Sequence, residues 1–261
     1  MKFIKQNYLD NLNHKQKEAI INPDGPCLVV AGAGSGKTKV LTSRVAHIIK
    51  NKKAWPNQIL CVTFTNKAAR EMQNRISSYL SVKISSLPWL GTFHSVCAKL
   101  LRRHAEAVGL NSRFTIIDQE DQLRLIKNIC KADNIDVKKI SPQWILSFIN
   151  KWKNKGMLPK DVTIKKGIPL EKAILNVYKF YQERLKILNS CDFGDLILLC
   201  VSMFENNPDI LKIYLNNFKY ILVDEYQDTN FIQSKWLQLL CKKNNNICCV
   251  GDDDQSIYSW R

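Results

Sequence analysis

The chain lacks several features that would place it in other classes of protein. None of its apolar runs approaches the roughly 18 residues that a membrane-spanning helix needs. Its amino-terminal stretch, residues 1–7, is too short and too polar for a signal peptide. It has no internal repeats and no low-complexity tail. We therefore expect a globular cytoplasmic protein with no membrane partner.

The nine cysteines do not follow the spacing of a metal site. No Cys-x-x-Cys pair occurs, and most of the cysteines lie in apolar stretches. An odd number of cysteines without metal spacing is typical of reduced, buried thiols in a cytosolic protein. We interpret the adjacent Cys248 and Cys249 as core residues of a buried strand.

Acidic residues are scarce relative to basic ones. The 261 residues include 39 Lys and Arg but only 23 Asp and Glu, which gives a formal net charge of +16. Residues 111–190 alone carry 16 Lys and Arg against 8 Asp and Glu. Such an excess indicates a polyanionic partner, although lysine drift in a biased genome would produce the same excess.

Residues 31–38 read Ala-Gly-Ala-Gly-Ser-Gly-Lys-Thr. They follow the apolar run 27–31 and precede a helical pattern over 40–50. A strand, a loop of small residues ending in Gly-Lys-Thr and a helix are typical of a phosphate-binding P-loop. The residues predicted to bind the phosphates of a nucleotide are Ala31, Gly32, Ala33, Gly34, Ser35, Gly36, Lys37 and Thr38.

The residue types of this loop suit phosphate chemistry. The glycines let backbone N–H groups converge on one point and leave room for a phosphate, and the following helix adds the positive end of its dipole. Lys37 can reach the β- and γ-phosphates, and the Thr38 hydroxyl can ligate Mg²⁺. Ala31 stands where the strict pattern has glycine, which is tolerable if its φ is negative. The alternative is a glycine-rich turn with a chance lysine.

A second motif places acids at the end of the apolar run 220–224. In a P-loop protein, a parallel strand next to the first delivers a carboxylate near Mg²⁺, and Asp224 is placed to do so. Glu225 can polarise a water for attack on the γ-phosphate. Many P-loop kinases do not need this second acid, so the pair predicts hydrolysis of a nucleoside triphosphate. A solvated acidic turn is the alternative.

Strand-like and helix-like segments alternate along most of the chain, which predicts an α/β fold with a doubly wound parallel sheet. Ligands of such sheets bind outside the carboxyl ends of the strands, where Gly36, Asp224 and Asp252 fall. The expected strands are 27–31, 59–63, 220–224 and 247–251, with 90–92 as a candidate fifth. The expected helices between them are 40–50, 67–80, 94–107 and 231–240.

The middle of the chain has a different pattern. It is mostly helical and basic, and it includes Trp144 and Trp152. We predict an α-helical subdomain, residues 112–189, inserted into an α/β domain formed by residues 1–111 and 190–261. The helical patterns of this subdomain are 119–132, 142–155 and 170–188.

Seven blocks of the chain together resemble superfamily 1 helicases of the UvrD/Rep/PcrA type. Their order and spacing match across essentially the whole chain. The resemblance implies a RecA-like P-loop NTPase domain with an inserted helical subdomain, ATP as substrate, Mg²⁺ as cofactor, and single-stranded DNA and single-strand/duplex junctions as partners. The blocks are residues 12–19, 31–38, 62–72, 91–95, 192–196, 222–230 and 250–261.

The resemblance also implies roles for individual residues. Gln16 is expected to read the adenine edge, since an amide can both donate and accept hydrogen bonds. Gln255 is implied as the γ-phosphate sensor, which makes Lys37, Glu225 and Gln255 the catalytic set. Trp260 and Phe64 are implied as stacking platforms for bases. The full set of implied DNA contacts is Phe64, Thr92, His94, Tyr258 and Trp260.

Bland interpretations of these residues stay open. Gln16 is equally explained as an exposed helical residue, the aromatic residues as core residues, and His94 as a structural histidine. Arg44, which follows the P-loop on its helix, is either a nucleotide contact or a solvated arginine. Two residues depart from the family pattern: Gly194 replaces a larger residue, and Ser259 replaces a frequent glycine.

The printed sequence ends directly after the last block, whereas family members continue into a second RecA-like domain. That domain supplies arginines for the ATP site, an aromatic that stacks on adenine and the other half of the DNA track. We therefore expect the amino-terminal motor half of an ATP-hydrolysing 3′→5′ DNA helicase or translocase, with the second lobe missing. A biological pathway, such as DNA repair or replication restart, does not follow from the sequence.

Three alternatives remain at this point. The first is a truncated nucleotide- and DNA-binding fragment that lacks helicase activity unless a partner lobe is supplied. The second is the helicase half of a helicase–nuclease, for which no nuclease cluster is visible in the sequence. A P-loop kinase or GTPase fits worse, because neither accounts for Gln16, Gln255 and the aromatic residues at 258 and 260.

Overall fold

The computed structural model describes residues 7–32, 34–81, 87–133, 135, 140–164 and 169–252. Contacts within the chain divide it into two compact units. The first unit comprises Met1–Val96, Pro208–Thr229 and Leu237–Arg261. The second comprises Cys97–Asn207 and Asn230–Trp236.

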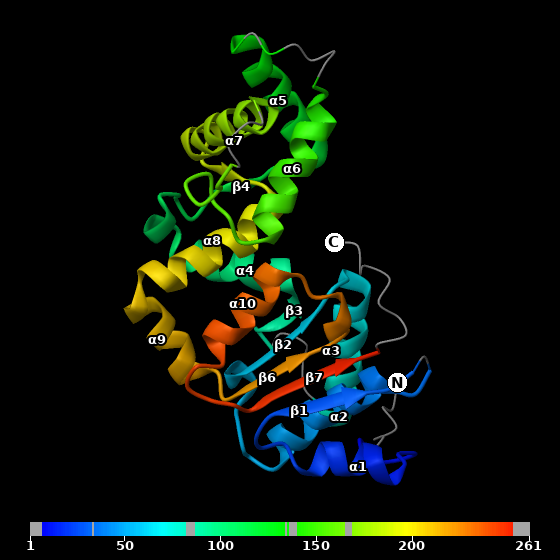
Figure 1. Ribbon diagram of the computed structural model, residues 1–261. Coiled ribbons are helices and arrows are strands. Elements are labelled where there is room, and N and C mark those ends of the chain that lie inside the picture. The colour runs from blue at the N-terminus through cyan, green and yellow to red at the C-terminus, as the bar shows by residue number, and fades with distance from the viewer. Residues whose placement is uncertain are drawn as a thin grey trace. The chain divides into compact units, whose positions relative to one another are not determined.

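A parallel sheet forms the centre of the first unit. Figure 1 shows its five strands side by side, with β1 at one edge and β3 at the other. The β2 strand is buried along its whole length, as expected of a strand with helices or loops on both faces. In spatial order the strands are β1 (Cys27–Val30), β7 (Ile247–Gly251), β6 (Tyr220–Val223), β2 (Ile59–Thr63) and β3 (Leu90–Thr92).

These strands confirm the predicted α/β class with a parallel sheet. The predicted strands 59–63, 90–92 and 247–251 have the predicted bounds, and the other two end one residue earlier than predicted. Neighbouring strands are parallel at every pairing of this sheet. The apolar runs identified the strands because each run is short, rich in branched residues and bounded by polar or small residues.

The predicted order of the strands was wrong at one place. The strand that delivers Asp224 was expected beside the P-loop strand, but β7 lies between them. Cys27 pairs with Cys248, and Val30 pairs with Gly251. As a result, Asp252, which directly follows β7, emerges next to the P-loop. Strand order depends on how helices pack on the sheet, and a one-dimensional pattern does not report that packing.

Helices α2 (Lys37–Lys50) and α3 (Asn66–Leu80) cover one face of this sheet (Figure 1). Their apolar stripes supply Leu41, Val45, Met72 and Ile76 to a core that also contains side chains from β2, β6 and β7. The Thr65 side chain caps the start of α3 by accepting a hydrogen bond from the Ala68 amide.

Four more helices belong wholly or partly to the first unit. The sequence predicted α10 and most of α4 but not the other two. These helices are α1 (His14–Ile21), α9 (Pro208–Asn217), α4 (Phe93–Arg103) and α10 (Phe231–Leu240), and the last two contribute residues to both units. No helix among the described residues is both long and apolar enough to cross a bilayer.

The second unit is mainly helical. Its core joins apolar side chains of α5, α6 and α7, including Ile126, Ile149 and Val177. Its helices are α5 (Gln119–Ala132), α6 (Pro142–Asn154), α7 (Pro169–Ile187) and α8 (Phe193–Asn206), and its two-stranded sheet is formed by β4 (Thr115–Ile116) and β5 (Ser190–Cys191). The predicted insertion, residues 112–189, falls inside this unit, and its domain boundaries stay a prediction.

The second unit contains a buried ion cluster. Lys153 Nζ lies 2.6 Å from Asp192 Oδ2 and 2.7 Å from Asp195 Oδ1, and its side chain is 0% exposed. The Tyr181 hydroxyl donates to Asp192, and the Gln182 amide donates to Asp195. Burial and the charge of Asp192 raise the pKa of Asp195 to about 6.

The same cluster accounts for the departure at Gly194. A Cβ atom at this position would lie 3.0 Å from Lys153 Cδ, which is tighter than an ordinary van der Waals contact. A larger residue would therefore displace the Lys153 stem from the two carboxylates. Glycine at 194 suits the path that the lysine takes in this chain.

Candidate nucleotide site

The P-loop connects β1 to α2 in the first unit. Gly34 and Gly36 have φ angles of 70° and 82°, in the left-handed region that favours glycine. A Cβ atom on Gly32 or Gly34 would meet nothing within 4 Å, so this side of the loop is open to a ligand. Ala33 lies outside the described residues. The loop therefore has the backbone that a phosphate cradle requires.

Ala31 does not have a positive φ, which is the condition under which alanine is tolerated here. Its amide donates to the carbonyl oxygen of Gly251 at 3.1 Å, so the pairing of β1 with β7 continues to the start of the loop. Gly36 is the N-cap of α2, and Lys37 is its first residue. The unpaired amides and the positive dipole end of α2 thus face the loop.

A pocket of about 320 Å³ lies over the loop. Its remaining walls come from α3, which contributes Glu71 and Arg75, and from Glu225. Arg75 Nη2 lies 2.7 Å from Glu71 Oε1. The loop residues that line the pocket are Gly34, Ser35, Gly36, Lys37, Thr38 and Lys39. Except for Ala31, Gly32 and Ala33, the structure brings the predicted phosphate-binding residues to one pocket.

Lys37 is held by three oxygen atoms of the first unit. Its Nζ lies 2.9 Å from Asp252 Oδ2, 2.6 Å from the Ala31 carbonyl oxygen and 3.1 Å from the Gly32 carbonyl oxygen. The Lys37 and Asp252 side chains are 9% and 3% exposed. The sequence placed Asp252 at a strand end but gave no partner for it. The signal that could have identified Asp252 as a site residue is its place directly after an apolar strand, which it shares with Asp224.

Asp224 follows β6 and is 2% exposed. One carboxylate oxygen lies 3.4 Å from Thr63 Oγ1, and the other is buried with no hydrogen-bond partner among the described residues. Burial and the neighbouring charge of Glu225 raise the pKa of Asp224 to about 6. A buried carboxylate oxygen without a partner favours a cation or a water as its ligand. Carboxylate and hydroxyl oxygens are the ligands that Mg²⁺ prefers, and the assignment of Asp224 and Thr38 as its ligands stays a prediction.

Glu225 and Gln227 form a second link near β7. Glu225 has a φ of 52°, an uncommon conformation for a residue with a side chain. Gln227 Nε2 donates to Glu225 Oε2 at 2.8 Å, and Gln227 Oε1 accepts from the Asp252 amide at 3.0 Å. A Cβ atom on Gly251 would lie 2.9 Å from Gln227 Oε1, so a larger residue there would displace the Gln227 amide. Sequence reasoning missed Gln227, which lies inside the acidic block that it identified.

Gln16 lies against the P-loop. Its Nε2 donates to the Ser35 carbonyl oxygen at 2.8 Å, and its Oε1 accepts from the Asn13 amide at 2.9 Å, which completes a capping box at the start of α1. The structure therefore brings Gln16 and the phosphate loop together across 19 residues of chain. Its role as an adenine reader stays a prediction.

The expected DNA contacts are only partly described. Phe64 follows β2, is half-buried, and its ring centroid lies 5.4 Å from that of Phe93. Thr92 accepts a hydrogen bond from the Ser95 amide through its hydroxyl, at the start of α4. His94 is half-buried. Gln255, Tyr258, Ser259 and Trp260 lie outside the described residues. The DNA-binding set thus stays a prediction.

Arg44 differs from expectation. The side chain is 1% exposed and donates to the Ala19 carbonyl oxygen, so it is not a solvated arginine. It is also not among the residues that line the pocket over the P-loop. A helical period identifies the face on which a residue lies, but a fully buried arginine needs partners that come from elsewhere in the chain.

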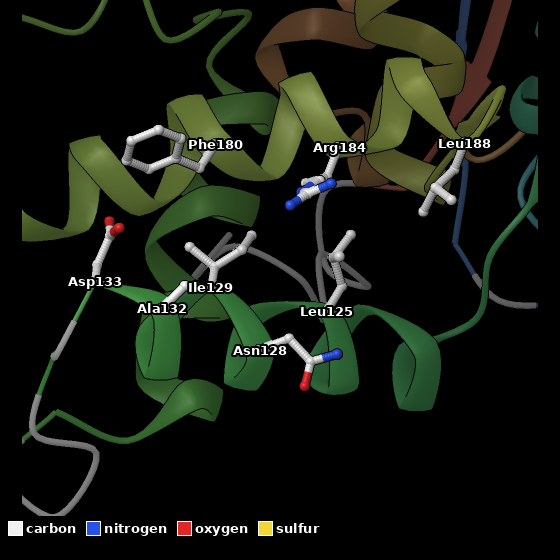
Figure 2. Close-up of a pocket in the computed structure, with 8 residues that line it drawn as sticks. All are labelled: Leu125, Asn128, Ile129, Ala132, Asp133, Phe180, Arg184 and Leu188. Atoms are coloured by element: carbon white, nitrogen blue, oxygen red, sulfur yellow. The ribbon is translucent and has the colours of Figure 1, made fainter.

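A second pocket, of about 430 Å³, lies in the second unit between α5 and α7. Figure 2 shows Phe180 and Arg184 on α7, and Leu188 just after it, opposite Leu125 and Ile129 on α5. Its lining is largely apolar with one arginine, and it contains no glycine loop at a helix N-terminus. The P-loop pocket is therefore the one suited to a nucleotide phosphate.

Comparison with known proteins agrees with this geometry. Residues 12–261 match the family model described as the UvrD/REP helicase N-terminal domain. The chain is 48% identical over 259 residues to a probable DNA helicase II homolog from Rickettsia felis, which covers 98% of this chain and 39% of that relative.

Two further relatives share 44% sequence identity with the chain. The chain is 44% identical over 261 residues to the ATP-dependent DNA helicase PcrA of Bacillus subtilis, which covers 100% of this chain and 35% of that relative. It is 44% identical over 253 residues to PcrA of Staphylococcus aureus strain Mu50, which covers 97% of this chain and 34% of that relative. The chain thus spans little more than a third of these relatives.

Proposed function

Because this chain belongs to the family of UvrD/REP helicase N-terminal domains, we propose that it binds and hydrolyses ATP as the amino-terminal part of a DNA helicase motor. The observation that supports this most directly is the P-loop pocket, in which Lys37 and the start of α2 meet the acidic ends of β6 and β7. The names of the relatives, DNA helicase II and PcrA, agree with this class.

The β- and γ-phosphates are proposed to lie over the loop from Gly34 to Thr38. Backbone amides at the start of α2 would donate to the phosphate oxygens. Lys37 would exchange its ion pair with Asp252 for these oxygens, and it would thereby neutralise part of their charge. Gln16, which already touches the loop through Ser35, is proposed to face the adenine.

The ligands proposed for Mg²⁺ are the Thr38 hydroxyl and the Asp224 carboxylate. The support is the buried Asp224 oxygen that has no partner among the described residues. When bound, Mg²⁺ supplies charge neutralisation at the phosphates. In this arrangement, Asp224 and Thr38 act by orienting the cation, and the thermodynamic cost of burying Asp224 as an anion is offset by the metal charge.

Glu225 is proposed as the general base. Its carboxylate would accept a proton from the attacking water, while the new O–P bond forms at the γ-phosphate and the bond to the β-phosphate oxygen breaks, leaving ADP. Gln227 holds Glu225 in place through a 2.8 Å hydrogen bond. Gln255 is proposed to sense the γ-phosphate and to couple the loss of this phosphate to the residues of the DNA-binding groove.

The proposed partner is single-stranded DNA, with a single-strand/duplex junction ahead of the motor and 3′→5′ movement. Phe64, Thr92, His94, Tyr258 and Trp260 would line the track. The net charge of +16 supports a polyanionic partner. Movement requires closure against a second RecA-like lobe, so helicase activity is proposed for the longer protein rather than for these residues alone.

Steady-state ATP hydrolysis tests the proposal, measured with and without single-stranded DNA and Mg²⁺. The chain should show slow hydrolysis that Lys37→Ala abolishes. Lys50→Ala is the matched control, because Lys50 is the exposed last residue of the same helix and does not line the pocket. Lys37-dependent ATP binding without turnover would favour the alternative, a nucleotide- and DNA-binding module. Binding and hydrolysis that are both insensitive to Lys37 would contradict the proposal.

A further inference from the structure

Two cysteines occupy paired positions on neighbouring strands. Cys27, the first residue of β1, is the register partner of Cys248 on β7. Cys27 packs against the core cluster that contains Cys248. Neighbouring strands are about 4.8 Å apart, and Cα atoms joined by a disulfide are usually about 4.4–6.8 Å apart. The spacing of neighbouring strands therefore falls within the Cα range of a disulfide.

A buried arginine accompanies the pair. Arg44 is 1% exposed, its side chain donates to the Ala19 carbonyl oxygen, and its charge acts on the Cys27 thiol. The hydrogen bond from Cys248 and then the charge of Arg44 lower the pKa of Cys27 below its ordinary value, while the pKa of Cys248 is raised. Asp24, which binds Lys53 and Tyr220, is the acidic group that also faces Arg44.

The two thiols differ in access. Cys27 is only half-buried, and among the described residues its strand pairs on one side only, with β7. Cys248 is 2% exposed. A small oxidant can therefore approach Cys27 from solvent while Cys248 is held behind it. Cys241 offers a contrast, because it is similarly half-buried but no arginine among the described residues shifts its pKa, which burial raises to about 11.

We propose that Cys27 is a peroxide-reactive thiol and that Cys248 is its resolving partner, so that the pair forms a reversible disulfide between β1 and β7. The Cys27 thiolate attacks one oxygen of hydrogen peroxide, the O–O bond breaks, and the departing hydroxide takes up a proton to become water. Cys27 is then a sulfenic acid. The Cys248 sulfur attacks the Cys27 sulfur, the S–O bond breaks, and the proton of Cys248 leaves with the hydroxide as a second water. A dithiol reductant reverses the bond by exchange.

This site does not depend on ATP hydrolysis, and the test does not use it. The purified chain is treated with hydrogen peroxide, its remaining thiols are alkylated, and its peptides are analysed by mass spectrometry. We expect a linked peptide that contains Cys27 and Cys248 and that disappears after dithiothreitol. We also expect iodoacetamide to label Cys27 about tenfold faster than Cys241 at neutral pH.

Single substitutions separate the two steps. Cys248→Ser should leave a Cys27 sulfenic acid that dimedone traps, and Cys27→Ser should give neither the adduct nor the linked peptide. Cys241→Ser is the matched control and should behave like the unsubstituted chain. Equal labelling of Cys27 and Cys241 in the unsubstituted chain, or the lack of a Cys27–Cys248 peptide after peroxide, would overturn the assignment even if a variant folded poorly.

Discussion

Lys37 Nζ lies 2.9 Å from Asp252 Oδ2, across 215 residues of chain. Lys37 begins α2 and Asp252 follows β7, so the contact joins the P-loop helix to the strand that separates β1 from β6. Both side chains are buried, and each would be left with an unmatched charge if the other were removed. The lysine that is proposed to bind phosphate is therefore paired with an internal acid.

We expect strong energetic coupling between these two residues. In a double-mutant cycle with Lys37→Met and Asp252→Asn, the coupling in the free energy of unfolding should be about 1–3 kcal/mol, because the pair is buried and hydrogen-bonded. Urea unfolding of the four proteins without nucleotide measures it. The control pair is Arg75 and Glu71, which are more exposed and should couple by less than about 1 kcal/mol. Additive effects of the two buried substitutions would contradict the prediction.

The buried Asp224 predicts a pH dependence. Its pKa is raised to about 6, whereas an unfolded aspartate titrates near about 3.9. Between these values the folded state binds more protons than the unfolded state, so the free energy of unfolding falls as the pH rises. Asp224→Asn should remove this fall, making the variant more stable than the unsubstituted chain by up to about 3 kcal/mol at pH 7 and by little at pH 4.

Urea unfolding at a series of pH values in buffer with EDTA tests this prediction, since a bound cation would stabilise the carboxylate. The quantity to follow is the difference between the two proteins, which cancels the titration of all other groups. A difference that stays constant from pH 4 to pH 7 would show that Asp224 does not titrate in this window.

Lys153 should be necessary for the second unit to fold. Lys153→Met leaves two buried carboxylates, Asp192 and Asp195, without their cation, and we expect a loss of about 3–5 kcal/mol in the free energy of unfolding. Lys151→Met, on the exposed face of the same helix, is the control and should change it by less than about 0.5 kcal/mol. Thermal and urea unfolding followed by circular dichroism compare the two. Similar free energies of unfolding for Lys153→Met and Lys151→Met would show that this cluster does not stabilise the second unit.

Gln227 should affect turnover more than binding, provided that the proposed hydrolysis occurs. Gln227→Met removes the hydrogen bonds to Glu225 and to the Asp252 amide, so the general base loses its orientation. We expect kcat to fall about ten- to hundredfold, with ATP affinity changed by less than about twofold. Tyr226→Phe, at the neighbouring exposed position, serves as control. A matching loss of ATP affinity would assign Gln227 to ground-state binding instead.

The sequence by itself determined the local elements of this protein. The strand Ile59–Thr63 and the helix Gln119–Ala132 have the predicted bounds, because a short apolar run marks a fully buried strand and an apolar period of about 3.6 residues marks the buried face of a helix. The P-loop could also be recognised from the sequence, because left-handed glycines and a helix N-terminus next to a strand are properties of consecutive residues.

Only the tertiary structure decided which of these elements are neighbours. The position of β7 between β1 and β6 brings Asp252 to Lys37, the Asp252 amide to Gln227 and Cys248 to Cys27, and none of these partnerships has a spacing that a sequence period could carry. The burial of Arg44 has the same origin. Side-chain partners far apart in the chain are chosen by how helices and strands pack, and packing is a property of the whole fold rather than of any segment.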